Sequence, residues 1–308
     1  MDSKTLKYIL KRFFLSFLTI FLIITITFFI MHAVPSSPFS KEKALTESVR
    51  KALEAKFGLD KPLLQQYTIY LKNAIQLDFG ESIHYKGWSV IELIMTGFKT
   101  SMLVGIIAAG LALTLGVILG SLAAIKRESL IDKVILVVTT ASVSLPAFVV
   151  AIVLLYVFGV MWRIFPTRGD TAAGLIMPII SLMAYPCAYV TKLTRSSMLD
   201  VLGQDYIRTA HAKGVMPRKV LFKHALKNAL TPVITYAGPM IAYVVTGSIV
   251  VEQIFSIAGL GQYFVTSIIN SDYTMIMGTT IFLSVIMVGM TFLCDILYKV
   301  IDKRIDFS

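Results

Sequence analysis

Residues 205–214 of this chain read DYIRTAHAKG, and residues 223–232 read KHALKNALTP. Both stretches are polar and basic, although 56% of the chain is hydrophobic and only 15% is charged. The segment from Lys192 to Thr231 that holds them contains no apolar run of about 20 residues, the length that crosses a bilayer as a helix. It therefore predicts an extramembrane loop inside an otherwise very apolar chain.

Helix start and stop signals divide this loop into two helical arms. Asp205 is expected to cap a helix from Tyr206 to Lys213, and Gly214 is placed to end it. Pro217 suits the first turn of the next helix.

The second arm presents three lysines on one face, at i, i+4 and i+8: Lys219, Lys223 and Lys227. The apolar residues Val220, Leu221 and Ala225 are displaced from that face. Such a pattern fits a basic amphipathic helix against lipid headgroups as well as a docking surface for a protein.

Composition places the chain among membrane proteins. It has 308 residues, a charged fraction well below the quarter that is usual in soluble domains, and a mean hydropathy of +0.77. Cys187 and Cys294 lie in apolar runs without metal-ligand spacing, and the four histidines form no cluster, so no metal site is expected.

Six apolar runs are long enough to cross a bilayer: residues 13–31, 101–125, 134–161, 174–191, 232–251 and 274–298. Basic residues precede the first run, as in a signal peptide, but Val34-Pro35 stands where a cleavage site should be. A retained anchor is the preferred interpretation.

The distribution of charge orients these spans. With the N-terminus in the cytoplasm, 18 of the 29 Lys and Arg residues and 8 of the 18 Asp and Glu residues fall inside, a net charge of +10. The outside segments then carry only +1. This is the usual bias of membrane proteins, so the net charge of +11 indicates contact with anionic lipid headgroups and not with nucleic acid.

The expected fold is therefore an all-α membrane protein with six transmembrane helices and both termini in the cytoplasm. An anchor occupies residues 1–33, an extracytoplasmic helical insertion residues 34–100, and five further spans residues 101–308, with the cytoplasmic loop at 192–231. The insertion shows two amphipathic stripes separated by Gly58 and Pro62: Leu45, Val49, Leu53 and Phe57, then Leu64, Tyr67, Leu71 and Ile75. Packing against the rest of the protein is favoured over a platform for a soluble partner.

The second span carries Gly116 and Gly120, extended by Ala112 and Ala124 at the same spacing. Small residues four apart let two helix backbones approach closely, in this chain or in another. Prolines at positions 146, 178, 186 and 239 permit kinks in the later spans.

The loop resembles the EAA loop of ABC-importer permeases, in the variant of the peptide-import branch. Thr209 and Ala210 fill its small positions, Gly214 is its glycine, and Arg208 stands where other branches have glutamate. His211 occupies a position where this branch usually has arginine. Further resemblance lies in five segments outside the loop: residues 32–39, 56–62, 77–82, 246–252 and 259–261. The whole chain looks most like the first permease subunit of oligopeptide importers; importers of dipeptides, nickel and glutathione share the pattern.

This resemblance implies a role in the bacterial cell membrane, as half of a pathway for oligopeptides. The coupling site would comprise seven residues of the first arm (Asp205, Arg208, Thr209, Ala210, His211, Ala212 and Gly214), with the three lysines on the second. The implied partners are a second, different permease subunit, two cytoplasmic ATPases, an extracytoplasmic peptide-binding protein and membrane lipids. ATP and Mg²⁺ would be used by the ATPases.

The chain itself is not expected to be an enzyme or to bind a cofactor, since it has no Gly-x-x-x-x-Gly-Lys-Ser/Thr, Gly-x-Ser-x-Gly or His-Glu-x-x-His motif. A secondary transporter would show inverted repeats and buried mid-membrane charges, and an intramembrane enzyme would need paired catalytic residues. Glu252 and Asp295 are the nearest candidates for such charges, and both are expected at an interface.

Overall fold

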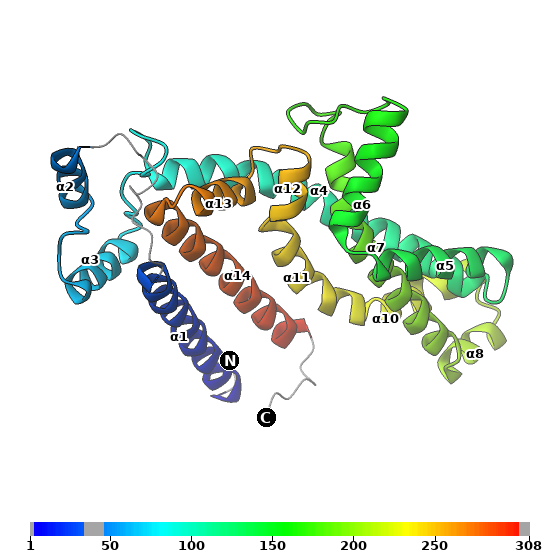
Figure 1. Cartoon of the computed structure of the whole chain (residues 1–308). Coiled ribbons are helices and arrows are strands. Elements are labelled where there is room, and N and C mark those ends of the chain that lie inside the picture. Colours follow the sequence, from blue (N-terminus) through cyan, green and yellow to red (C-terminus); the bar gives the residue numbers. More distant parts are fainter. Residues whose placement is uncertain (1–2, 34–45, 302–308) are drawn as a thin grey trace. The chain divides into compact units, whose positions relative to one another are not determined.

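The computed structural model describes residues 3–33 and 46–301, and all of its regular elements are helices (Figure 1). Five helices in these residues are long and apolar enough to cross a membrane, or up to six if one bent pair forms a single span. The predicted residues Val34–Phe39 and Leu45 lie outside the described residues. The chain divides into two compact units: one comprises the parts before Ser101 and after Ile257, and the other comprises Ser101–Ile257.

The first unit pairs the first and last long helices. The helix α1 (Ser3–Ala33) lies along α14 (Tyr273–Ile301), and Arg12 forms an ion pair with Asp295 at 3.2 Å between them. The unit also contains α2 (Glu47–Lys56), α3 (Leu63–Ile75), the start of α4 (Val90–Ile125) and α13 (Leu260–Ile269), which the sequence did not predict.

The two helices of the insertion form as predicted. Gly58 ends the first with a φ of +68°, and the second begins after Pro62. The face of α3 that packs inward differs from the predicted stripe, because Leu64 and Ile75 are 73% and 84% exposed. Its inner face carries Tyr67, Tyr70 and Ala74, and both tyrosine rings contact Phe28 of α1. Aromatic packing therefore decides the orientation of α3.

A buried carboxylate holds the start of α14. Asp272 is fully buried and accepts hydrogen bonds from the N–H groups of Met275 at 3.1 Å and His84 at 3.0 Å, and from the hydroxyl of Ser82. It acts as the helix N-cap and at the same time ties the loop before α4 to this helix.

The second unit is built on α4 and α7 (Ile176–Leu202). A Cβ atom at Gly120 would lie 2.5 Å from the carbonyl oxygen of Thr191, and one at Gly116 would lie 2.6 Å from Val190. The predicted close approach of backbones is confirmed, and the partner helix belongs to the same chain. The helix α7 runs eleven residues beyond the predicted end of the fourth span, so the loop begins on a helix.

The third predicted span is broken near Pro146. It consists of α5 (Leu130–Ser144), then α6 (Ala147–Leu154) continued by the π-helical η1 (Leu155–Met161), and the two parts meet at 107°. Proline lacks the N–H that would continue the helix, and the sequence had placed a kink there. The fifth span is α11 (Thr231–Val245), followed by α12 (Ile249–Ile254).

Candidate functional site: the loop between α7 and α11

The first arm of the loop is α8 (Asp205–Ala212), one residue earlier than predicted. Gln204 is the N-cap residue and makes no side-chain cap, so the prediction that Asp205 caps this helix is wrong. Asp205 lies in the first turn, where a negative charge is favourable, and its carboxylate lies 3.7 Å from Arg208. Both side chains are exposed, so this ion pair contributes little to stability.

Gly214 ends α8 in the left-handed conformation, with a φ of +74°. Its N–H donates to the carbonyl of His211 at 2.9 Å, and the N–H of Val215 donates to the carbonyl of Ala210 at 3.1 Å. These two bonds form a Schellman motif, which satisfies the last carbonyls of the helix and reverses the chain. The assignment of Gly214 as the helix stop is confirmed.

The second arm is a continuous helical run with a π-helical middle: α9 (Pro217–Lys219), η2 (Val220–Leu226) and α10 (Lys227–Ala229). Pro217 occupies its first turn, as predicted. All three predicted lysines are exposed, whereas Val220 and Ala225 are fully buried. The arm leads through Leu230 into α11.

A buried apolar cluster, here called the loop core, joins both arms to the ends of two spans. Its buried members are Ala124 of α4, Met198 of α7, Ile207 and Ala210 of α8, Val220 and Ala225 of η2, and Ala229 of α10. Sequence reasoning had placed Ala210 among the small residues of a docking face, but the structure turns it inward, only 9% exposed. Burial in this core makes the loop a packed extension of α4 and α7.

The face of α8 that remains exposed carries Arg208, Thr209, His211 and Ala212. Tyr206 lies beside it and accepts a hydrogen bond of 2.9 Å from the side-chain amide of Asn228, which braces α8 against α10. Six of the seven predicted coupling residues thus lie on α8, all exposed except Ala210, and Gly214 lies in the turn that follows it.

An ion pair that sequence reasoning missed fixes the base of the loop. Arg195 of α7 donates two hydrogen bonds of 2.7 Å to the carboxylate of Asp132 in the first turn of α5. The Asp132 side chain is 3% exposed and also accepts from the N–H of Glu128 at 3.0 Å. The two residues are 63 positions apart, so no local sequence pattern pointed to them.

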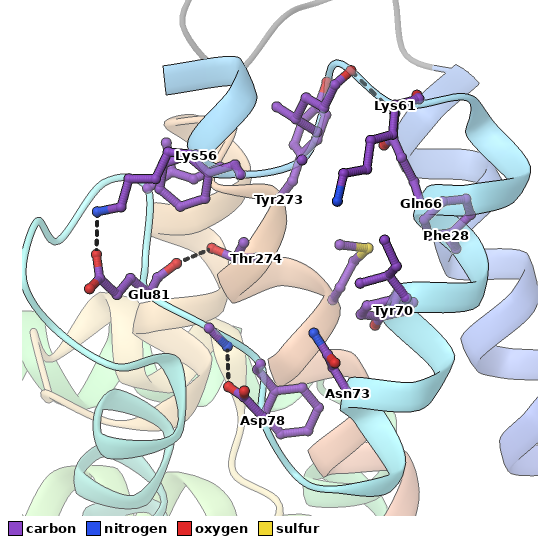
Figure 2. A pocket seen from close by; sticks show the side chains of 18 of the residues that line it. Phe28, Lys56, Lys61, Gln66, Tyr70, Asn73, Asp78, Glu81, Tyr273 and Thr274 are labelled. Atoms are coloured by element: carbon purple, nitrogen blue, oxygen red, sulfur yellow. Dashed lines mark hydrogen bonds and ion pairs between the residues drawn. The ribbon is translucent and has the colours of Figure 1, made fainter. Parts of the chain in front are cut away.

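A cavity of about 340 Å³ lies in the first unit, between α3, the turn after α2 and the start of α14 (Figure 2). Most polar groups around it hold its walls together. Lys56 binds Glu81 at 2.6 Å, and the hydroxyl of Thr274 donates to the carbonyl of Glu81 at 2.8 Å. Gln66 spans the opposite wall, where it donates to the carbonyl of Lys61 at 2.7 Å. These contacts explain how the insertion keeps its shape.

Burial in this wall also alters one tyrosine. The hydroxyl of Tyr70 has no hydrogen-bond partner within the described residues, and desolvation raises its pKa above the ordinary value.

Glu252 and Asp295, the two candidate membrane charges, each interact with another residue of the chain. Glu252 is 3% exposed and accepts a hydrogen bond of 2.7 Å from Ser101, in the second unit. Asp295 has its partner in Arg12. Each carboxylate therefore has a structural role at its position.

Comparison with known proteins identifies the family. Residues 116–307 match the family described as "Binding-protein-dependent transport system inner membrane component", and residues 5–114 match its N-terminal counterpart, "Binding-prot-dependent transport system membrane comp, N-term".

Three curated relatives are similar over almost their whole length. The dipeptide transport system permease protein DppB of Bacillus subtilis (strain 168) is 44% identical over 97% of this chain and 97% of the relative. The oligopeptide transport system permease protein OppB of Haemophilus influenzae is 39% identical over 98% of this chain and 100% of the relative. The corresponding DppB of Lactococcus lactis is 41% identical, over 97% and 99%.

These matches also fix the class of protein. Such permeases are membrane channel components without enzymatic activity of their own, and they work with ATPase subunits and a substrate-binding protein. The apolar helices agree with a multi-pass protein of the bacterial plasma membrane. The chain belongs to the binding-protein-dependent transport system inner membrane component family, as a permease subunit of a peptide ABC importer.

Proposed function

We propose that α8 is the coupling helix of this permease and that its outer face binds a cytoplasmic ATPase subunit. The supporting observation is the loop core, because Ile207 and Ala210 anchor α8 to the ends of α4 and α7 while the opposite face of α8 remains exposed. A force applied to such a helix is passed to the spans through packed side chains. This assignment places the loop in the cytoplasm, as the distribution of basic residues predicts.

The chain then forms half of the pathway. A second, different permease subunit supplies the other half, and an extracytoplasmic binding protein delivers the peptide. ATP and Mg²⁺ act in the ATPase subunits, whose closure moves the coupling helices.

Bulky substitutions on the outer face of α8 test this assignment. We expect Thr209→Trp and Ala212→Trp to reduce both co-purification of the ATPase subunits and peptide uptake at least tenfold, because a large ring prevents the helix from entering a groove. Met216→Trp is the matched control, since Met216 is 73% exposed just after α8. Full ATPase retention and full uptake in the α8 variants would reject the role of this face.

The substrate class has two candidates. Oligopeptides are the expected substrate, and the OppB relatives support this. Dipeptides are the second candidate, because the DppB of Bacillus subtilis shares more identity with the chain. Competition for uptake between peptides of two and five residues, with the native binding protein, separates them.

A further inference from the structure

Four tyrosines lie along one side of α7 and α11 in the second unit. The rings of Tyr185 and Tyr189 are stacked, with centroids 6.4 Å apart, and the ring of Tyr236 lies 4.4 Å from that of Tyr189. Tyr243 follows Tyr236 by seven residues, about two turns, and so lies on the same face of α11. Tyr185, Tyr189 and Tyr243 are 44%, 39% and 71% exposed.

Tyr185 lies deep in its span. It is seven residues before Lys192, the first charged residue of α7, which is about 10 Å along the helix at about 1.5 Å per residue. Tyr243 lies close to the end of α11 that is farther from the loop. Tyrosine is common at both membrane interfaces, which accounts for Tyr189 and Tyr236 nearer the loop and for Tyr243 at the other end of α11, but not for Tyr185.

The hydroxyl groups of all four make no hydrogen bond to other described residues. Lipid tails offer no partner for such a group, so a polar face at this depth requires protein or water beside it. Exposed side chains on two other helices of this unit are aliphatic: Leu103 and Ile106 on α4, and Val134 and Val137 on α5. The tyrosine face of α7 and α11 differs from those faces because it carries hydroxyl groups.

We propose that the face formed by Tyr185, Tyr189, Tyr236 and Tyr243 lines the peptide passage and that its hydroxyl groups exchange hydrogen bonds with the main chain of the passing peptide. A tyrosine hydroxyl both donates and accepts, which matches the alternating N–H and C=O groups of a peptide whatever its side chains. Pro186 adds to this polarity, since it has no N–H to donate to the carbonyl of Leu182 in the same helix. This inference rests on the proposed function and names the residues that contact the substrate.

Thiol labelling of the complete importer in proteoliposomes tests the placement. Cys187 and Cys294 are replaced by alanine, and Tyr185→Cys, Tyr243→Cys or Val137→Cys is introduced singly. The probes are a charged, membrane-impermeant methanethiosulfonate and an uncharged maleimide that enters lipid. Val137 is the control because it is 69% exposed on the aliphatic face of α5.

We expect the charged reagent to modify the cysteines at 185 and 243 at least tenfold faster than the cysteine at 137, and peptide with ATP to slow that reaction. Modification by the maleimide alone would place the face in lipid and overturn the proposal. Protection from both reagents in the complex, with reactivity in the isolated chain, would place the face under the second permease subunit and also overturn it.

A functional measurement separates this inference from the proposed function. Tyr185→Phe combined with Tyr236→Phe should raise the KM for peptide uptake at least fivefold while the ATPase subunits remain bound, whereas Tyr156→Phe on η1 leaves it unchanged. An unchanged KM in the double variant overturns the role of the hydroxyl groups. A wild-type complex that imports no peptide refutes the proposed function instead, and labelling still reports where the face lies.

Discussion

Arg195 on α7 binds Asp132 on α5 through two hydrogen bonds of 2.7 Å, and the aspartate is buried. The pair joins α7 to α5 three residues before Met198, the first residue of α7 in the loop core. Each partner satisfies the other's charge, and the Asp132 side chain is only 3% exposed, so the loss of Arg195 leaves a buried charge without compensation.

Arg195→Met is therefore expected to destabilise the protein by about 3 kcal/mol, the lower end for a broken buried pair, because the Arg195 side chain is 21% exposed. Thermal unfolding of the purified complex in detergent measures this. The double variant Asp132→Leu/Arg195→Met should recover much of the loss, since no unpaired charge remains. Equal stability of the single variant and the wild type would contradict the structural role of the pair.

Gly214→Pro should abolish transport while membrane insertion stays intact. Proline fixes φ near −65° and has no N–H, whereas Gly214 has a φ of +74° and donates to His211. Gly214→Ala is the graded control: nothing lies within 4 Å of its Cβ position, so only the backbone penalty of about 1–2 kcal/mol applies. Uptake assays on membranes with matched protein levels decide the matter, and normal uptake by the proline variant would refute the role of the turn.

Gly120→Leu should destabilise the protein by more than about 3 kcal/mol, because the side chain must displace the backbone of α7 at Thr191. The same change at Gly110, in the same helix, meets nothing within 4 Å and should alter the free energy of unfolding by less than about 0.5 kcal/mol. Similar unfolding temperatures for the two variants would disprove the close helix contact.

Tyr70→Phe should leave stability unchanged or raise it by about 1 kcal/mol, since it removes a buried hydroxyl without a partner. Burial raises the pKa of Tyr70 in the folded protein. Its ionisation therefore does not affect the free energy of unfolding at pH values below about 10, the pKa of tyrosine in the unfolded chain. Above that pH the unfolded tyrosine ionises first, and the wild type loses stability relative to the variant. Parallel stability curves for the two proteins between pH 9 and 11 would contradict the burial of this hydroxyl.

Topology is tested with cysteines at two exposed lysines, Lys72 on α3 and Lys213 after α8. In intact cells, a membrane-impermeant thiol reagent should modify the cysteine of Lys72→Cys and leave the cysteine of Lys213→Cys unmodified. The reverse pattern would overturn the orientation taken from the distribution of basic residues.

Much of this architecture could be predicted because membrane-length apolar runs and helix punctuation are local signals. Gly58, Gly214 and Pro217 were placed correctly because each position demands a particular backbone conformation. The small residues at 116 and 120 were also found, since their spacing is itself the signal.

What the sequence could not supply is orientation set by tertiary contacts. Ala210 was expected to face a partner, but the apolar side of α8 is decided by Met198 and Val220, which come from other helices. The pairing of Asp132 with Arg195 depends on how α5 crosses α7 and has no local pattern. The extension of α7 to Leu202 was missed for a related reason, because a charged helix continuing past the bilayer resembles a loop in hydropathy.

The contact of Gly116 and Gly120 with α7 has a mechanical consequence. Even a Cβ atom at either glycine would collide with α7, so the two helices fit together at these positions only with glycine there. We therefore expect α4 and α7 to move together as one rigid body during a transport cycle. The spans can bend instead at two other places. One is the 107° corner at Pro146. The other is Gly247, where a φ of +86° and the adjacent carboxylate of Glu252 disfavour any larger residue. The second unit thus combines a rigid pair of helices, α4 and α7, with two breaks at which its other spans can bend.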